Sequence, residues 1–76
     1  MVFRQYSSDE ATIKEWSRKL NSTNKGIFRT YSTPESTLYQ WSYILNKISP
    51  NISFPTYETA SQMLNDWEDK LNIIFN

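Results

Sequence analysis

Residues 28–46 read FRTYSTPESTLYQWSYILN, and this stretch decides the fold because the chain contains three versions of it. Residues 3–21 read FRQYSSDEATIKEWSRKLN, and residues 54–72 read FPTYETASQMLNDWEDKLN. In each version the Trp follows the Tyr by ten residues and precedes the Leu by four. Three rare Trp residues in one register indicate a tandem repeat of about 25 residues. We therefore divide the single 76-residue domain into copies at 2–21, 27–46 and 53–75.

The second half of each copy has the apolar spacing of an amphipathic helix. In the middle copy, Trp41 and Leu45 come three and seven positions after Leu38, which places the three residues in one stripe on a helix. An Asn follows the Leu in every copy, and Asn suits the left-handed backbone that ends many helices. In the third copy, Ile74 continues the stripe past that Asn, so the last helix is expected to extend into the tail.

The helix starts are predicted from polar residues that precede each apolar stripe. Ser7 with Glu10, and Ser32 with Glu35, have the spacing of a capping box, in which each side chain bonds the backbone amide of the other. The third copy lacks this pair, so Thr56 or Thr59 is expected to cap its helix.

The first half of each copy is predicted to be a short strand. Residues 2–6, 27–31 and 52–57 are rich in aromatic and β-branched residues, which favour extended structure. The predicted fold is a small α+β domain of three βα repeats, with the strands packed against three amphipathic helices. Pro55 cannot donate a ladder hydrogen bond, so the third strand should lie at an edge. The alternative is a three-helix bundle with extended linkers.

Two arrangements of the copies remain open at this point. One βα unit cannot bury its own apolar face, so the copies must pack on one another. They either close into a pseudo-threefold domain with the Trp residues near the axis, or stack in a line with exposed ends that favour a dimer.

Composition argues against most catalytic functions. The chain has no His and no Cys, so the commonest general base and the strongest nucleophile are missing. Its single Gly excludes a phosphate-binding loop, and its carboxylate groups fall on polar helix faces. We expect a non-enzyme with no catalytic residues, no metal and no cofactor.

The N-terminal residues do not have the apolar run of a signal peptide, and no stretch of the sequence approaches the roughly 20 apolar residues of a membrane span. These two observations predict an intracellular, cytoplasmic protein without membrane contact.

One predicted binding site would hold a small anionic, nucleotide-like ligand. Arg4 and Tyr6 recur as Arg29 and Tyr31, and Lys25 adds a charge beside the second pair. On an extended chain such an Arg and Tyr share one face, where they would bind a phosphate and stack on a base. The alternative interpretation is that the Phe and Tyr rings are core and that the Arg side chains lie along the edge of the sheet. The zero net charge argues against extended nucleic acid as a partner.

The favoured function is protein binding. Tyr39 and Tyr43 flank Trp41 and point away from the Leu stripe, so they form an aromatic pair four residues apart. Tyr is enriched in the residues that dominate binding energy. We therefore expect a non-catalytic protein that binds a protein partner or itself through these two residues, unless they pack under the neighbouring copy. Short, Cys-free chains rich in Ser and Asn are typical of phage and mobile-element proteins, which suggests an inhibitor.

Overall fold

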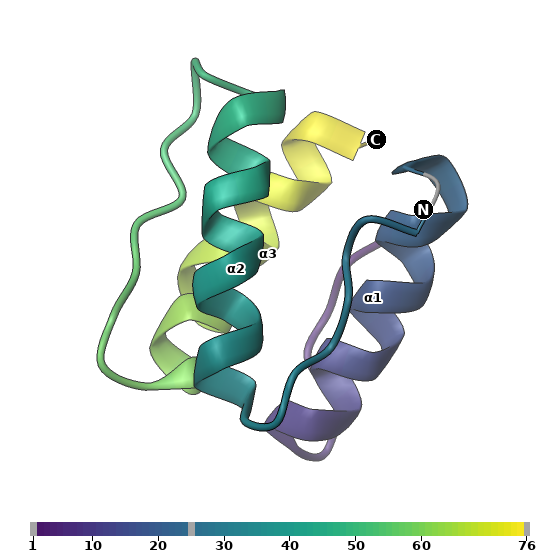
Figure 1. The fold of residues 1–76 in the computed structure, drawn as a ribbon, viewed down its shortest axis with the longest axis vertical. Coiled ribbons are helices and arrows are strands. Elements are labelled where there is room, and N and C mark those ends of the chain that lie inside the picture. Colours follow the sequence, from purple (N-terminus) through teal and green to yellow (C-terminus); the bar gives the residue numbers. More distant parts are fainter. Residues whose placement is uncertain (1, 25, 76) are drawn as a thin grey trace.

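The computed structural model describes residues 2–24 and 26–75, except for the side chains of residues 23 and 24. It contains the helices α1 (Asp9–Asn24), α2 (Pro34–Ile48) and α3 (Ala60–Phe75), and the described residues form no strand. The predicted α+β fold is therefore wrong, and the alternative of a three-helix bundle with extended linkers is found. All three helices run in the same direction, and an extended segment returns along the bundle before each one (Figure 1).

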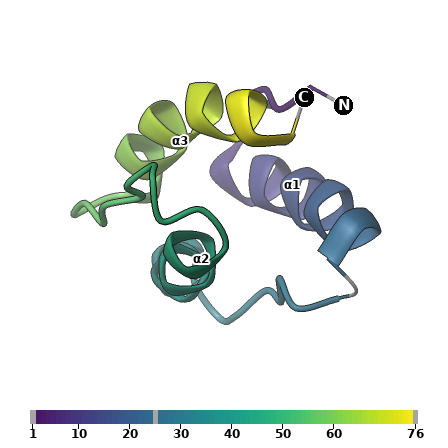
Figure 2. The same ribbon diagram turned by 90° about the horizontal axis from the view of Figure 1, so that it is seen from above.

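Each extended segment runs between two neighbouring helices, and we call the three places that the segments occupy the first, second and third grooves. The first groove holds residues 27–33 between α1 and α2 (Figure 2). The second groove holds residues 52–59 between α2 and α3, and the third holds residues 2–8 between α3 and α1. Because helices flank every segment, its backbone polar groups must find partners among side chains instead of a neighbouring strand.

An Asn from the preceding helix supplies the main replacement for a strand partner. In the first groove, the Phe28 amide donates to Asn21 Oδ1 at 2.8 Å, and Asn21 Nδ2 donates to the Phe28 carbonyl at 2.9 Å. We call this two-bond arrangement the Asn clamp. Asn46 clamps Phe54 in the same way in the second groove. The expectation that these Asn residues end their helices is wrong, since every helix continues beyond its Asn.

A Trp supplies the second replacement. The indole Nε1 of Trp16 donates to the Arg4 carbonyl at 2.8 Å. The corresponding bonds run from Trp41 to the Arg29 carbonyl at 2.9 Å and from Trp67 to the Pro55 carbonyl at 3.1 Å. In the third copy the acceptor therefore belongs to the proline, which needs no N–H for this role.

The ring of copies closes on itself through the same clamp. The Phe3 amide donates to Asn72 Oδ1 at 2.7 Å, and Asn72 Nδ2 donates to the Phe3 carbonyl at 2.9 Å. This contact joins residues 69 positions apart, and it places the first extended segment beside the last turns of α3 (Figure 2). Of the two arrangements left open by the sequence, the closed pseudo-threefold one is found.

The core consists of the repeated aromatic and aliphatic residues. Each Phe meets the Trp of its own copy edge-on, with ring centroids 5.7, 5.7 and 5.6 Å apart in the three copies. The largest side chains with no exposed surface are Phe3, Trp16, Leu20, Phe28, Leu38, Trp41, Leu45, Phe54, Met63, Leu64, Trp67 and Leu71. Edge-on ring pairs add to the free energy gained by burial alone.

The first two helix caps differ from the predicted ones by one position. Ser8, rather than Ser7, accepts from the Ala11 amide at 3.1 Å, and Thr33, rather than Ser32, accepts from the Ser36 amide at 3.1 Å. Thr59 is confirmed as the third cap, and it forms a reciprocal pair with Gln62. Capping depends on where the backbone turns into the helix, so a Ser-Ser or Ser-Thr pair leaves the position ambiguous in the sequence.

Among the described helices, none combines the length and the apolar character needed to cross a membrane.

Candidate functional site

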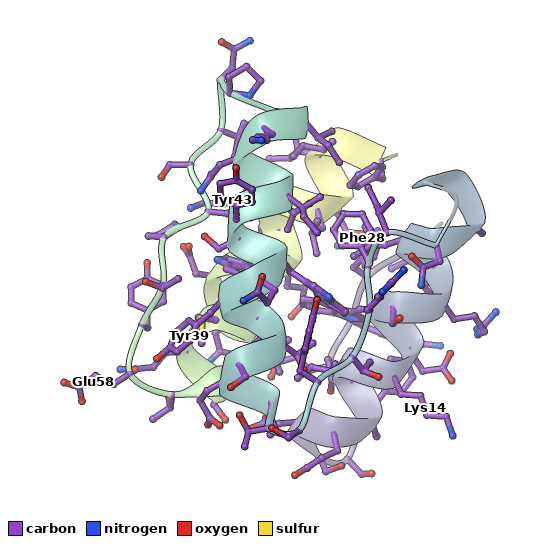
Figure 3. The ribbon with its side chains drawn as sticks, in the orientation of Figure 1. Lys14, Phe28, Tyr39, Tyr43 and Glu58 are labelled. Carbon is purple, nitrogen blue, oxygen red and sulfur yellow. The ribbon has the colours of Figure 1, made fainter. Side chains whose placement is uncertain are left out.

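The outer face of α2 carries the two Tyr residues predicted to bind a protein. Tyr43 is 63% exposed and Tyr39 is 43% exposed, and the two project from the same side of the helix (Figure 3). The alternative, in which they pack beneath a neighbouring copy, is not found for Tyr43. It is found in part for Tyr39, because the Tyr39 hydroxyl donates to the Tyr57 carbonyl in the second groove at 3.2 Å.

A cation completes this face. The Lys47 ammonium group lies 4.5 Å from the centre of the Tyr43 ring, one helical turn further along α2. Tyr57 is 37% exposed and borders Tyr39 from the adjacent segment. We call Tyr39, Tyr43, Lys47 and Tyr57 the tyrosine face. An exposed ring beside a cation can accept a contact on its remaining surface without a large loss of side-chain entropy.

The corresponding positions of the other helices carry no aromatic residue. The position of Tyr39 is occupied by Lys14 in the first copy and by Asn65 in the third. The position of Tyr43 is occupied by Arg18 and Asp69. The pair of Tyr39 and Tyr43 is therefore specific to the second copy, and the other two copies fold without it.

The residues predicted to bind an anion are divided between two grooves. Arg4 and Tyr6 lie in the third groove, whereas Arg29 and Tyr31 lie in the first, on the other side of α1 (Figures 1 and 2). The four residues therefore lie in two separate places and do not form one site. The predicted contribution of Lys25 lies outside the described residues.

The pair in the third groove has an additional cation that the sequence argument missed. The Lys19 Nζ donates to the Tyr6 hydroxyl at 3.3 Å, and the Arg4 guanidinium carbon lies 5.8 Å from the centre of the same ring. The side chains of Arg4 and Lys19 hold the pKa of the Tyr6 hydroxyl below its ordinary value of 10.0, because hydrogen bonds from cations favour the phenolate. In the second copy Ile44 stands where Lys19 stands in the first.

A depression of about 320 Å³ lies at the N-terminal end of α1, along the first groove. Its lining includes Ile13, Lys14, Tyr31 and Pro34. The sequence argument missed this depression, although one signal for it was present. Aligning the copies shows that Lys14 replaces the Tyr39 that fills the matching position of the second groove.

The carboxylates are distributed over the surface. Within residues 2–24 and 26–75, no three of them are grouped closely enough to hold a metal ion. Asp66 forms an ion pair with Lys70 at 2.8 Å, and Glu15 forms one with Arg18 at 2.7 Å. The Arg18 side chain lowers the pKa of Glu15 below its ordinary value.

No protein-family model matches this chain, and no curated protein and no solved structure matches it either. The geometry of the chain itself is therefore the basis for its functional interpretation.

Proposed function

We propose that this chain is a non-catalytic binding protein that acts through protein–protein interaction, with the tyrosine face as its contact surface. One observation carries the proposal: two exposed Tyr residues occupy outer positions of α2 that hold charged or amide side chains on α1 and α3. An exposed aromatic side chain has a cost in solubility. Its presence at two adjacent positions is consistent with selection for contact.

The chemistry of the face fits a protein partner. Tyr buries a large area at a low entropic cost, and its hydroxyl bonds polar groups at the rim of an interface. Lys47 beside Tyr43 would bring a positive charge to the contact, which favours a partner with acidic residues around an apolar centre.

The test uses Tyr43→Ala, because the described contacts of Tyr43 include no hydrogen bond whose loss would disturb the fold. Arg18→Ala and Asp69→Ala are matched controls, since they truncate the corresponding positions of α1 and α3. Each protein is immobilised, a partner is captured from cells of its source and identified, and its affinity is then measured with purified components.

We expect Tyr43→Ala to weaken that affinity by about 30-fold, as is typical of a dominant interface residue, and the controls to change it by less than about threefold. Thermal melting must show that all three variants are folded. A partner that binds the wild type and Tyr43→Ala equally would refute the proposed surface.

A second candidate function is a sink or sensor for a small anionic, nucleotide-like ligand. The observation that favours it is the pairing of Arg4 and Lys19 around Tyr6, which gives two cations and a ring in one place. Calorimetry against a nucleotide panel should detect heat that Arg4→Ala abolishes and Arg29→Ala, the matched control, preserves. The absence of heat across the panel would exclude this function.

A further inference from the structure

The three grooves differ at the level of the Tyr that ends each extended segment. In the second groove, Tyr39 reaches across and donates its hydroxyl to the Tyr57 carbonyl. In the third groove, Asn65 occupies the matching helix position and accepts a hydrogen bond from Gln5. Both of these grooves are thus bridged by the side chain that the preceding helix presents.

The first groove lacks such a bridge. Lys14 occupies the matching position, and none of the described residues donates a hydrogen bond to the Tyr31 carbonyl. The depression of about 320 Å³ lies here, with the almost fully buried Ile13 among its lining residues and the half-exposed Tyr31 beside it. A volume of this size is at the lower end of the range for ligand pockets.

We propose that this depression binds a tyrosine side chain presented by another protein. The ring would lie over Ile13 between Lys14 and Tyr31, and its hydroxyl would donate to the Tyr31 carbonyl. Tyr39 in the second groove is the template for this arrangement, because it makes the same contact within the chain. The Lys14 ammonium group would interact with the ring face, as Lys47 does with Tyr43.

The hydroxyl determines the specificity of the site. A buried carbonyl that loses water without gaining a donor costs free energy, so a phenylalanine in the same place would bind more weakly. The site lies on the opposite side of α2 from the second groove, and it uses none of the residues of the tyrosine face. It can therefore fail or succeed separately from the proposed function.

The first experiment fills the depression from within. Lys14→Tyr places a tyrosine at the position equivalent to Tyr39, and Arg18→Tyr is the matched control one turn along the same helix. We expect Lys14→Tyr to raise the melting temperature by about 4 °C through burial of the ring and the new hydrogen bond, and Arg18→Tyr to leave it unchanged. An equal or lower melting temperature for Lys14→Tyr would show that the first groove does not accept the ring.

The second experiment measures binding directly. N-acetyl-tyrosinamide is titrated into the labelled wild-type protein, and the backbone amide resonances of Ile13, Tyr31 and Thr37 are followed by NMR. We expect saturable shifts with a Kd of about 1 mM, typical of a small fragment, and about tenfold weaker binding of N-acetyl-phenylalaninamide. Lys14→Tyr should abolish the shifts, whereas Arg18→Tyr should retain them.

Three outcomes would overturn the proposal. The first is an absence of saturable shifts up to the solubility limit of the probe, and the second is equal affinity for the phenylalanine analogue. The third is a set of groove resonances that shift with protein concentration alone, because the occupant would then be a second copy of this chain and not a different protein.

Discussion

The inner sides of the three helices match one another, whereas their outer sides differ. On the inside, every copy presents a fully buried Trp that bonds a carbonyl of its own segment and an Asn that clamps the next segment. On the outside, the two corresponding positions hold Lys and Arg in α1, two Tyr in α2, and Asn and Asp in α3. The comparison teaches that the fold depends on the repeated residues. Copy-specific functions should accordingly be sought among the residues that differ.

The largest expected effect tests whether the inner sides are energetically equivalent. Trp16→Ala, Trp41→Ala and Trp67→Ala should each destabilise the protein by about 4 kcal/mol, because each leaves a large cavity and an unpaired carbonyl. A domain of this size has little more stability than that, so the variants should be largely unfolded. Urea denaturation followed by circular dichroism measures the effect. A markedly smaller loss for one Trp would break the threefold equivalence.

The Asn clamps provide the next comparison, because two join neighbouring copies and the third closes the ring. Asn46→Ala leaves the Phe54 amide without its partner, whereas the Phe54 carbonyl keeps the hydrogen bond that the Ser42 hydroxyl donates to it, and we expect a loss of about 2 kcal/mol. Asn72→Ala should cost a similar amount if the closing contact is as tight as the internal ones. A near-zero effect of Asn72→Ala in urea denaturation would mean that the ring is open in solution.

The C-terminal tail is a feature of the third copy that the other two copies lack. Ile74 and Phe75 are partly buried, and the Phe75 ring lies 6.1 Å from that of Phe3. Removing residues 73–76 should therefore destabilise the fold by about 2 kcal/mol, through loss of buried apolar area. Removing residue 76 alone is the control. An unchanged melting temperature after the longer truncation would show that the tail contributes nothing to the core.

The smallest expected effect concerns Lys19 beside Tyr6, because Ile44 occupies the matching position of the second copy. The folded-state pKa of Tyr6 is lowered below 10.0, so its contribution to stability is present above the unfolded-state pKa and is lost as the pH falls through the folded-state value. Ultraviolet titration should show Tyr6 ionising below the ordinary tyrosine pKa. Lys19→Ala should raise that pKa, and Lys14→Ala should not. An unchanged Tyr6 titration in Lys19→Ala would remove the basis for the anion site.

Much of the fold could be predicted because each copy contains the same apolar spacing, and this spacing favours a helix. The spacing of Leu38, Trp41 and Leu45 requires a helix, and the same spacing in the other copies requires three. The positions of the extended segments were also predicted, but the groups to which their backbones bond were not. Local preference for extended backbone does not distinguish a strand partner from a side-chain partner, and Asn21 offers both groups that a strand would offer.

The candidate site was only partly predictable for a related reason. The exposure of Tyr43 follows from its position on the helix, opposite the buried stripe. The partial burial of Tyr39 depends on a carbonyl 18 residues further along the chain, and the pairing of Lys19 with Tyr6 depends on a contact across 13 residues. Helical periodicity contains no information about either distance.

The sequence by itself determined the three-copy organisation, the helices and the identity of the core residues, because these depend on spacing within a single copy. Only the tertiary structure decided that the segments lie in grooves without forming a sheet, that Asn72 closes the ring on Phe3, and that Arg4 and Arg29 belong to segments in different grooves. These features depend on how one copy meets the next. The free energies of such contacts come from side-chain hydrogen bonds and burial between residues that are distant in the chain.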